Sequence, residues 1–215
     1  MKRVLCYVVM LSAILAMMPQ MQAEAQSVCS PGRHQLTVFT GYDFTGRCVV
    51  YDIKTIKNVG KGINDQIRSV LLGKDTFAVA CVDKNFYGDC EEFYKSRNVN
   101  LVDRITSIVV QQWECIPNSG EITLFSDVMF GGVCAKFYAS GTANDPYYYS
   151  DLSTPLNTGS YNDVASSLMV NHAEVILCEH RNFGGVCEKH VASAWDLTNY
   201  AIGNDRVSSL QVFAH

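Results

Sequence analysis

Four copies of one six-residue phrase constrain the fold of this chain more than any other feature of its sequence. The copies read NDQIRS from Asn64, VDRITS from Val102, NDVASS from Asn162 and NDRVSS from Asn204. Each has an aspartate second and a serine sixth, three have a hydroxyl residue fifth, and all lead into a short apolar segment. Aspartate and hydroxyl oxygens on a tight turn are hard ligands that suit calcium, so we interpret the phrase as a calcium-binding repeat.

The cysteine spacing indicates a tandem duplication. Of nine cysteines, Cys6 stands apart near the start of the chain. The other eight define two intervals that each occur twice. The interval from Cys29 to Cys48 equals that from Cys115 to Cys134, and the interval from Cys81 to Cys90 equals that from Cys178 to Cys187. The two halves are predicted to be two domains, residues 26–112 and 113–215.

Each half divides again into two units with the periodicity of strands. A unit starts with an aromatic residue or cysteine, followed by a phenylalanine and then a glycine, as at Phe39, Phe44 and Gly46. The glycine permits a positive φ at a folded hairpin. Alternating segments predict strands before the hairpin, after it and after the phrase, at 36–39, 48–51, 90–93, 122–125, 69–72, 107–110, 167–170 and 209–213. No amphipathic helix of three turns is expected, and each half is predicted to be an all-β sandwich of two antiparallel sheets.

The first 25 residues resemble a targeting segment. Lys2 and Arg3 precede an apolar run from Val4 to Met18, and an Ala-Glu-Ala sequence ends at Ala25. Such a segment is typical of a signal peptide that is cleaved, here before Gln26. We therefore expect a secreted, soluble product, and an even number of remaining cysteines in an exported chain predicts disulfide bonds.

Composition and motifs argue against two classes of function. The net charge is −4, and the sequence lacks a basic stripe that could neutralise phosphates, so nucleic-acid binding is not expected. No nucleophile elbow, zinc-protease helix or phosphate-cradling loop is present, and the histidines lack metal-ligand spacing. The chain is predicted not to be an enzyme.

The aromatic hairpin at the start of each unit and the Asp-containing phrase at its end resemble the Greek key motifs of the βγ-crystallin superfamily. The resemblance covers the whole chain after residue 25 and implies two βγ-crystallin-like Greek key β-sandwich domains in tandem. It is closest in character to exported calcium-binding members. The paired cysteines depart from the usual pattern of that superfamily.

The resemblance also implies a ligand set for Ca²⁺. In each domain two sites cross, so that the aspartate of one phrase faces the fifth residue of the other. In the second domain the side-chain ligands would be Asp163 with Ser208 and Asp205 with Ser166, completed by the carbonyls of Val164, Arg206, Ser126 and Glu179. The alternative is that these phrases are hydrogen-bonded corners without an ion, since Asp and Ser side chains cap turns well.

The same scheme predicts one working site and one lost site in the first domain. Asp65 would pair with Thr106, which still offers a hydroxyl, whereas Asp103 would meet Arg68. An arginine at this position is expected to replace the ion by a charge-assisted hydrogen bond to the carboxylate.

The duplication favours a disulfide within every unit. The predicted pairs are Cys29 with Cys48, Cys81 with Cys90, Cys115 with Cys134 and Cys178 with Cys187. A bridge between the halves, such as Cys29 with Cys115, stays open at this point.

Two functions follow from these observations. The first is a secreted calcium-binding protein, stabilised by calcium and disulfides, that serves as a structural module of an extracellular matrix or coat. The second is a secreted toxin or a proteinase inhibitor-like interaction protein. Its contact element would be Tyr147–Tyr149, in an inserted segment read as an exposed surface loop that binds an extracellular protein partner.

Overall fold

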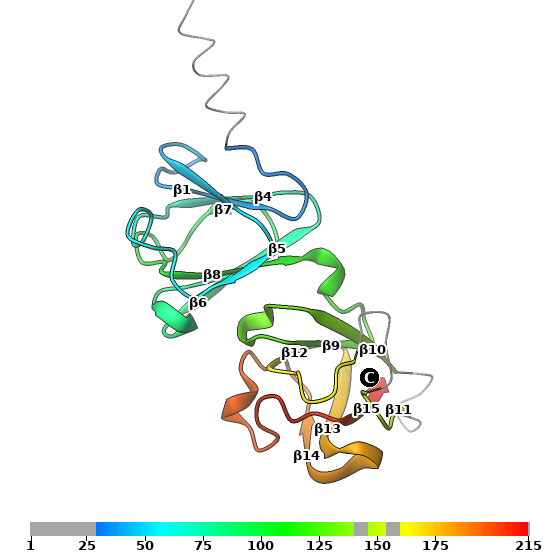
Figure 1. Ribbon diagram of the computed structural model, residues 1–215. Helices are drawn as coiled ribbons and strands as arrows, with labels where there is room; N and C mark the ends of the chain where they lie inside the picture. Colours follow the sequence, from blue (N-terminus) through cyan, green and yellow to red (C-terminus); the bar gives the residue numbers. More distant parts are fainter. Residues whose placement is uncertain (1–28, 140–145, 154–159, 215) are drawn as a thin grey trace, which may run out of the picture.

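The computed structural model describes residues 29–139, 146–153 and 160–214 and is built from antiparallel strands. The strands form two pairs of sheets, one above the other (Figure 1). The predicted leader lies outside the described residues. Within the described residues no helix is both long and apolar enough to cross a bilayer.

The first pair of sheets contains eight strands. These are β1 (Leu36–Phe39), β2 (Cys48–Tyr51), β3 (Lys54–Ile56), β4 (Ser69–Leu72), β5 (Thr76–Cys81), β6 (Cys90–Phe93), β7 (Arg97–Asn98) and β8 (Ser107–Gln112). Their orders are β2-β1-β4-β7 in one sheet and β3-β8-β5-β6 in the other. Each unit therefore has four strands. Its first, second and fourth strands lie in one sheet, and its third strand, β3 or β7, joins the sheet of the other unit. This exchange is the Greek key crossover.

The second pair of sheets repeats this plan. Its strands are β9 (Glu121–Phe125), β10 (Cys134–Tyr138), β11 (Tyr147–Tyr149), β12 (Ser167–Asn171), β13 (Ala173–His180), β14 (Gly184–His190) and β15 (Ser209–Ala214). The orders are β10-β9-β12 and β11-β15-β13-β14. In the place of a third strand in the last unit, a single bridge joins Leu168 to Ala194.

Short 3-10 turns punctuate the strands. They are η1 (Lys84–Phe86), η2 (Trp113–Cys115), η3 (Val128–Phe130), η4 (Arg181–Phe183) and η5 (Leu197–Asn199). Three of them, η1, η3 and η4, are the hairpins after the first strand of a unit, where a residue and the following phenylalanine both have positive φ. The chain therefore has an all-β architecture, as the strand periodicity predicts.

All four predicted disulfides are present, and the alternative bridge between the halves is wrong. Cys81 lies opposite Cys90 in the β5–β6 ladder, and Cys178 lies opposite Cys187 in the β13–β14 ladder. The other two bridges join the first residue of a second strand to a preceding segment: Cys29 to Cys48, and Cys115 to Cys134. Four disulfides indicate an oxidising environment.

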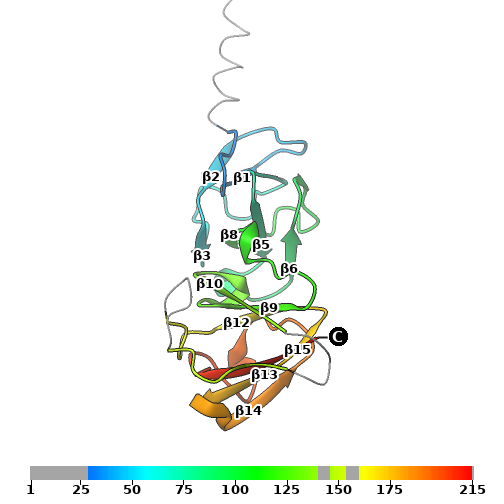
Figure 2. The same ribbon diagram turned by 90° about the vertical axis from the view of Figure 1, so that its right-hand side faces the viewer.

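A third apolar cluster joins the two sandwiches, in addition to the core inside each one. Strands β5 and β8 face β9 and β12 across it (Figures 1 and 2). Phe77, Val79 and Val109 supply the first sandwich's side, and Phe125 and Phe130 belong to the other. Because both faces of these strands are covered, β5 is buried along its full length. The periodicity of the sequence did not predict this packing of one domain on the other.

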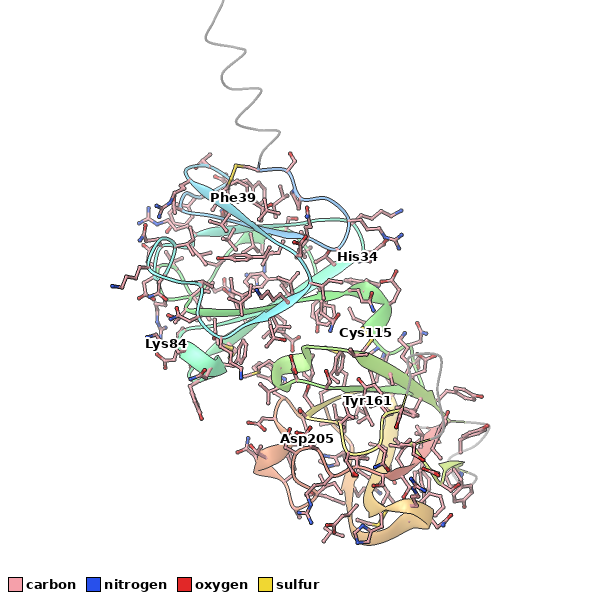
Figure 3. All side chains as sticks on the ribbon, in the orientation of Figure 1. His34, Phe39, Lys84, Cys115, Tyr161 and Asp205 are labelled. Carbon is pink, nitrogen blue, oxygen red and sulfur yellow. A yellow bond between two sulfur atoms is a disulfide. The ribbon has the colours of Figure 1, made fainter. Side chains whose placement is uncertain are left out.

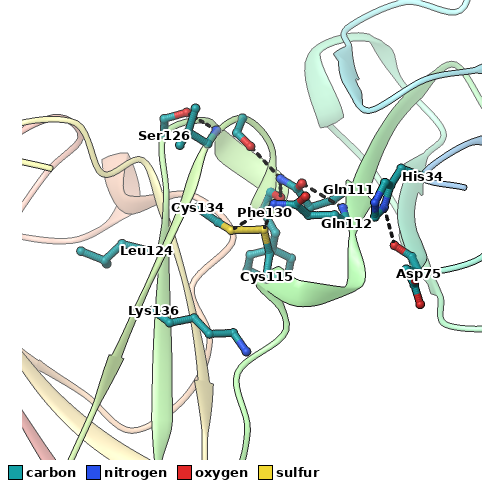
Figure 4. Close-up of a disulfide and its surroundings, with 12 residues drawn as sticks. His34, Asp75, Gln111, Gln112, Cys115, Leu124, Ser126, Phe130, Cys134 and Lys136 are labelled. Atoms are coloured by element: carbon teal, nitrogen blue, oxygen red, sulfur yellow. Dashed lines mark hydrogen bonds between the residues drawn. A yellow bond between two sulfur atoms is a disulfide. The ribbon is translucent and has the colours of Figure 1, made fainter. Parts of the chain in front are cut away.

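Two polar side chains also cross between the sandwiches. The buried Gln111 donates from Nε2 to the carbonyls of Gly132 at 2.7 Å and Phe130 at 3.3 Å, beside the Cys115–Cys134 disulfide (Figure 4). Thr55 donates to the Asp127 carboxylate at 2.7 Å. These bonds cross the interface beside its apolar cluster.

Candidate metal centres

The two phrases of each domain cross, and reciprocal backbone bonds hold them together. The amide of each aspartate donates to the carbonyl of the fourth residue in the other phrase. The bonds are Asp65 to Ile105 at 3.2 Å, Asp103 to Ile67 at 3.2 Å, Asp163 to Val207 at 3.0 Å and Asp205 to Ala165 at 2.9 Å. Each aspartate therefore faces the fifth residue of its partner phrase, with its own backbone held at a positive φ.

The fifth residue of each phrase is tied to the hairpin of its own unit. Its amide donates to a carbonyl at or near the end of the unit's first strand, as from Ser166 to Phe125 at 2.8 Å and from Ser208 to Cys178 at 2.9 Å. The Ser166 hydroxyl also donates to the next carbonyl, that of Ser126, at 2.7 Å. Phrase and hairpin thus bring side-chain and main-chain oxygens to one place.

The sixth residue of the phrase has a separate, structural role. Its hydroxyl donates to a carbonyl at the start of the hairpin and accepts the amide of the hairpin phenylalanine. Ser167, for example, donates to Asp127 at 2.6 Å and accepts from Phe130 at 3.0 Å. Ser69, Ser107 and Ser209 repeat the pattern. A phenylalanine at positive φ is strained, so these paired bonds stabilise a hairpin that would otherwise be unfavourable.

Three aspartates present their two carboxylate oxygens in the same way. Oδ1 accepts from the hydroxyl of the partner phrase: Ser208 to Asp163 at 3.0 Å, Ser166 to Asp205 at 3.2 Å, and Thr106 to Asp65 at 3.3 Å. Oδ2 accepts from the asparagine that begins the same phrase, at 2.5 Å for Asp163 and Asp65 and at 2.7 Å for Asp205. The asparagine therefore orients the carboxylate and leaves Oδ1 directed at the hydroxyl.

The fourth aspartate has a different partner. Asp103 accepts from Arg68 Nε at 3.0 and 3.1 Å and from Nη2 at 2.8 Å, which is the arginine contact expected from the sequence. These hydrogen bonds lower the pKa of Asp103 and raise that of Arg68. The phrase of Asp103 begins with Val102 in place of asparagine. Asp103 therefore both faces the Arg68 cation and lacks the asparagine amide that orients the other three aspartates.

The described residues form four Greek key units. Three of them place a third strand in the sheet of the neighbouring unit, and the phrases cross in pairs. The chain has the βγ-crystallin fold. Among solved structures it is similar to a βγ-crystallin domain from Flavobacterium johnsoniae (27% identity, 44% of this chain and 94% of that one, TM-score 0.35). It is also similar to a βγ-crystallin from Ciona intestinalis (26% identity, 45% and 100%, TM-score 0.35) and to a nickel complex of a clostrillin double mutant (22%, 44% and 98%, TM-score 0.36). The sequence matches no protein-family model, and no curated protein matches it significantly.

At three of the four pairs formed by an aspartate and the fifth residue of the other phrase, the oxygens fit a calcium ion. Neighbouring ligands about 2.4 Å from such an ion lie about 3 Å apart, close to the spacing of the Asp–hydroxyl pairs. At each pair the asparagine Oδ1 is buried and has no hydrogen-bond partner among the described residues: Asn64, Asn162 and Asn204. Such orphaned oxygens are what a site for a cation would leave. The described residues contain no cluster of three or more His, Cys, Asp or Glu side chains, so each site would rely on one carboxylate.

The remaining predicted ligands are main-chain carbonyls on the same turns. Val164 follows Asp163, Arg206 follows Asp205, and Glu179 follows the residue that accepts the Ser208 amide. The side chains of Glu179 and Arg206 form an ion pair with each other, and this bond lowers the pKa of Glu179. The charges of Glu179 and Arg206 are therefore paired with each other, and only the main-chain carbonyls of these two residues would bind a calcium ion.

The two sites of the second βγ-crystallin domain differ in their surroundings. Asp205, labelled in Figure 3, lines a groove of about 710 Å³ between the domains, together with Ser126 and Ser166. Lys54 and Lys57 of the first domain line the same groove. Asp127 lines the groove as well, so both signs of charge lie near the Asp205 pair.

The tyrosine segment is not the exposed loop that the sequence suggested. Tyr147–Tyr149 is strand β11, which pairs with β15 at the edge of a sheet. Only Tyr148 is exposed, at 56%, and its ring packs 5.6 Å from that of Phe183. The expected protein partner stays a prediction, and Tyr148 is the member of the triplet that could contact it. The earlier part of the insertion lies outside the described residues.

Proposed function

We propose that this protein is a secreted calcium-binding βγ-crystallin, non-catalytic, that serves as a calcium- and disulfide-stabilised structural module outside the cell. One observation carries the proposal. Three aspartates, each oriented by its own asparagine, face hydroxyls of the partner phrase, and the fourth faces an arginine. A purely structural corner would not require this division, because every phrase already has its backbone bonds and its sixth serine.

The role of this chain's residues is to bring two units together at one point. Calcium, when bound, supplies positive charge between the aspartate of one unit and the hydroxyl of the other. Binding to the folded state alone adds stability by mass action. With one carboxylate per site the affinity is expected to be low, on the order of the 10⁻⁴–10⁻³ M typical of extracellular modules.

Export is part of the proposal. The basic start, the apolar run and the Ala-Glu-Ala sequence ending at Ala25 are typical of a cleaved signal peptide. The four disulfides are compatible with an oxidising compartment outside the cytosol.

Calcium titration tests the proposal directly. Isothermal titration of the oxidised protein lacking residues 1–25 is expected to give about three ions, one for each aspartate–hydroxyl pair. Calcium is also expected to raise the melting temperature relative to chelator, and magnesium to do so much less. Asp163→Asn with Asp205→Asn should leave about one ion, bound by the first domain. No binding and no thermal shift would mean that the phrases are only folding corners.

Replacing Arg68 is expected to create a fourth site. Arg68→Ser removes the cation bonded to Asp103 and supplies a hydroxyl in the fifth position, so the titration should gain one ion. Arg68→Ala is the matched control, since it removes the charge without adding a ligand. Adding Val102→Asn should strengthen the new site by orienting Asp103. Equal ion counts in Arg68→Ser and the unmodified protein would contradict the assignment.

A further inference from the structure

Three tyrosines meet at one end of the second domain. Tyr138 is the last residue of β10, and Tyr147 and Tyr149 lie on the same side of β11. The ring centroids are 5.1 Å apart for Tyr138 and Tyr147, 4.7 Å for Tyr147 and Tyr149, and 6.3 Å for Tyr138 and Tyr149. Tyr148 points to the opposite side. None of these residues takes part in the candidate calcium sites.

The three rings are not equivalent. Tyr149 is held in place, because its hydroxyl accepts from the Tyr138 amide at 3.2 Å and donates to the Tyr138 carbonyl at 3.4 Å. Burial raises its pKa to about 12. Tyr138 is 53% exposed, and a hydrogen bond between its phenol and that of Tyr147 raises its pKa. Solvent therefore reaches the Tyr138 ring, whose centroid lies 5.1 Å from that of Tyr147.

We propose that Tyr138 and Tyr147 are a site of oxidative cross-linking, joined as dityrosine by a haem peroxidase with hydrogen peroxide. Each phenol loses one electron and its hydroxyl proton, and the two radicals couple through ring carbons ortho to oxygen. The ortho hydrogens then move to the oxygens, which restores both phenols. The peroxide takes up the two electrons and two protons and becomes two molecules of water, so the chain loses two hydrogen atoms.

The position of this pair gives the bond a structural consequence. β10 is an edge strand of one sheet of the second domain, and β11 is an edge strand of the other. A bond between Tyr138 and Tyr147 would join the two sheets covalently at their edges. The disulfides of this domain do not do this, since Cys178 and Cys187 lie within one sheet and Cys115 lies before the first strand. The proposal is independent of calcium binding.

Peroxidase treatment of the whole oxidised protein at low concentration tests the site. Dityrosine fluorescence is expected in the monomer band, with a peptide containing Tyr138 and Tyr147 that has lost two hydrogen atoms. Tyr138→Phe and Tyr147→Phe should each abolish the fluorescence of the monomer. Tyr148→Phe, on the other side of the same strand, and Tyr149→Phe should retain it.

Three outcomes would overturn the proposal. One is a cross-link mapped to Tyr147 and Tyr149, which would survive Tyr138→Phe. Another is dityrosine found only in covalent dimers, formed through exposed tyrosines such as Tyr87 and Tyr148. The third is the absence of dityrosine from the treated wild-type protein. Peptide mapping of the wild type decides among them even if a variant folds poorly.

Discussion

Replacing Ser167 with alanine is expected to lower the free energy of unfolding by about 2–4 kcal/mol in calcium-free buffer. The change removes the hydroxyl that donates to Asp127 and accepts the buried Phe130 amide. It leaves two backbone groups without partners and a phenylalanine at positive φ without its restraint. Equilibrium unfolding in urea with chelator present, followed by circular dichroism, measures the effect.

The neighbouring residue is the matched control. Ser166→Ala removes a hydroxyl that faces Asp205 and the Ser126 carbonyl. This side chain is also buried, but no backbone amide of the described hairpin donates to it. In chelator, Ser166→Ala should lower the free energy of unfolding much less than Ser167→Ala does. In the calcium titration, Ser166→Ala should remove one bound ion. Equal costs for the two serines in chelator would contradict the separation of a ligand from a structural serine.

At the level of sequence, only the family resemblance separated these two serines, because it makes the fifth residue the ligand. Both are hydroxyl residues in every phrase of the second domain, and pattern alone places them together. What distinguishes them is the strand that begins at the sixth position. The side chain of the sixth residue points toward the hairpin, whereas the fifth residue still lies on the turn where the two phrases cross. Arg68 in the fifth position was the useful signal, because an arginine paired with Asp103 marks this position as the one that faces the aspartate of the other phrase.

Much of the fold was predictable because the units repeat. Strands β1, β2, β4 and β6 have the predicted bounds, and the disulfides follow the duplicated cysteine intervals. The third strand of each unit escaped prediction, since β3, β7 and β11 are two or three residues long and pair with strands of another unit. A tyrosine-rich insertion was consequently taken for a loop when part of it completes a sheet.

The packing of the domains was also beyond the reach of periodicity. A strand buried on one face alternates, but β5 carries Ala78 and Ala80 toward the core and Phe77 and Val79 toward the other domain. A continuous apolar run of this kind does not reveal what covers its second face. Phe86 and Phe130 belong to the same covered surface, whereas Phe44 is exposed.

This difference leads to the second large effect. Phe130→Ala is expected to cost about 3–5 kcal/mol, because Phe130 is buried between the domains against Phe125 and Trp195. Phe44 is a close match in its local structure: it has a similar positive φ, it donates its amide to a sixth-position serine, and its ring packs on that of Phe39. It differs in exposure, 39% against 1% for Phe130. Phe44→Ala should therefore cost well under half as much.

The comparison isolates the domain interface from the hairpin. Both variants remove the phenylalanine of corresponding hairpins, one in each domain, so the loss of the hairpin's own contacts should contribute similarly in both urea titrations. A larger cost for Phe130→Ala measures what burial of the ring adds, through Trp195 of its own domain and through the apolar cluster shared with the first domain. Similar costs would mean that the side chain stabilises its own hairpin and that the two domains contribute little to each other. The interface would then depend on the other side chains of the apolar cluster, such as Phe77 and Val79, and on the hydrogen bonds of Gln111 and Thr55 that cross it.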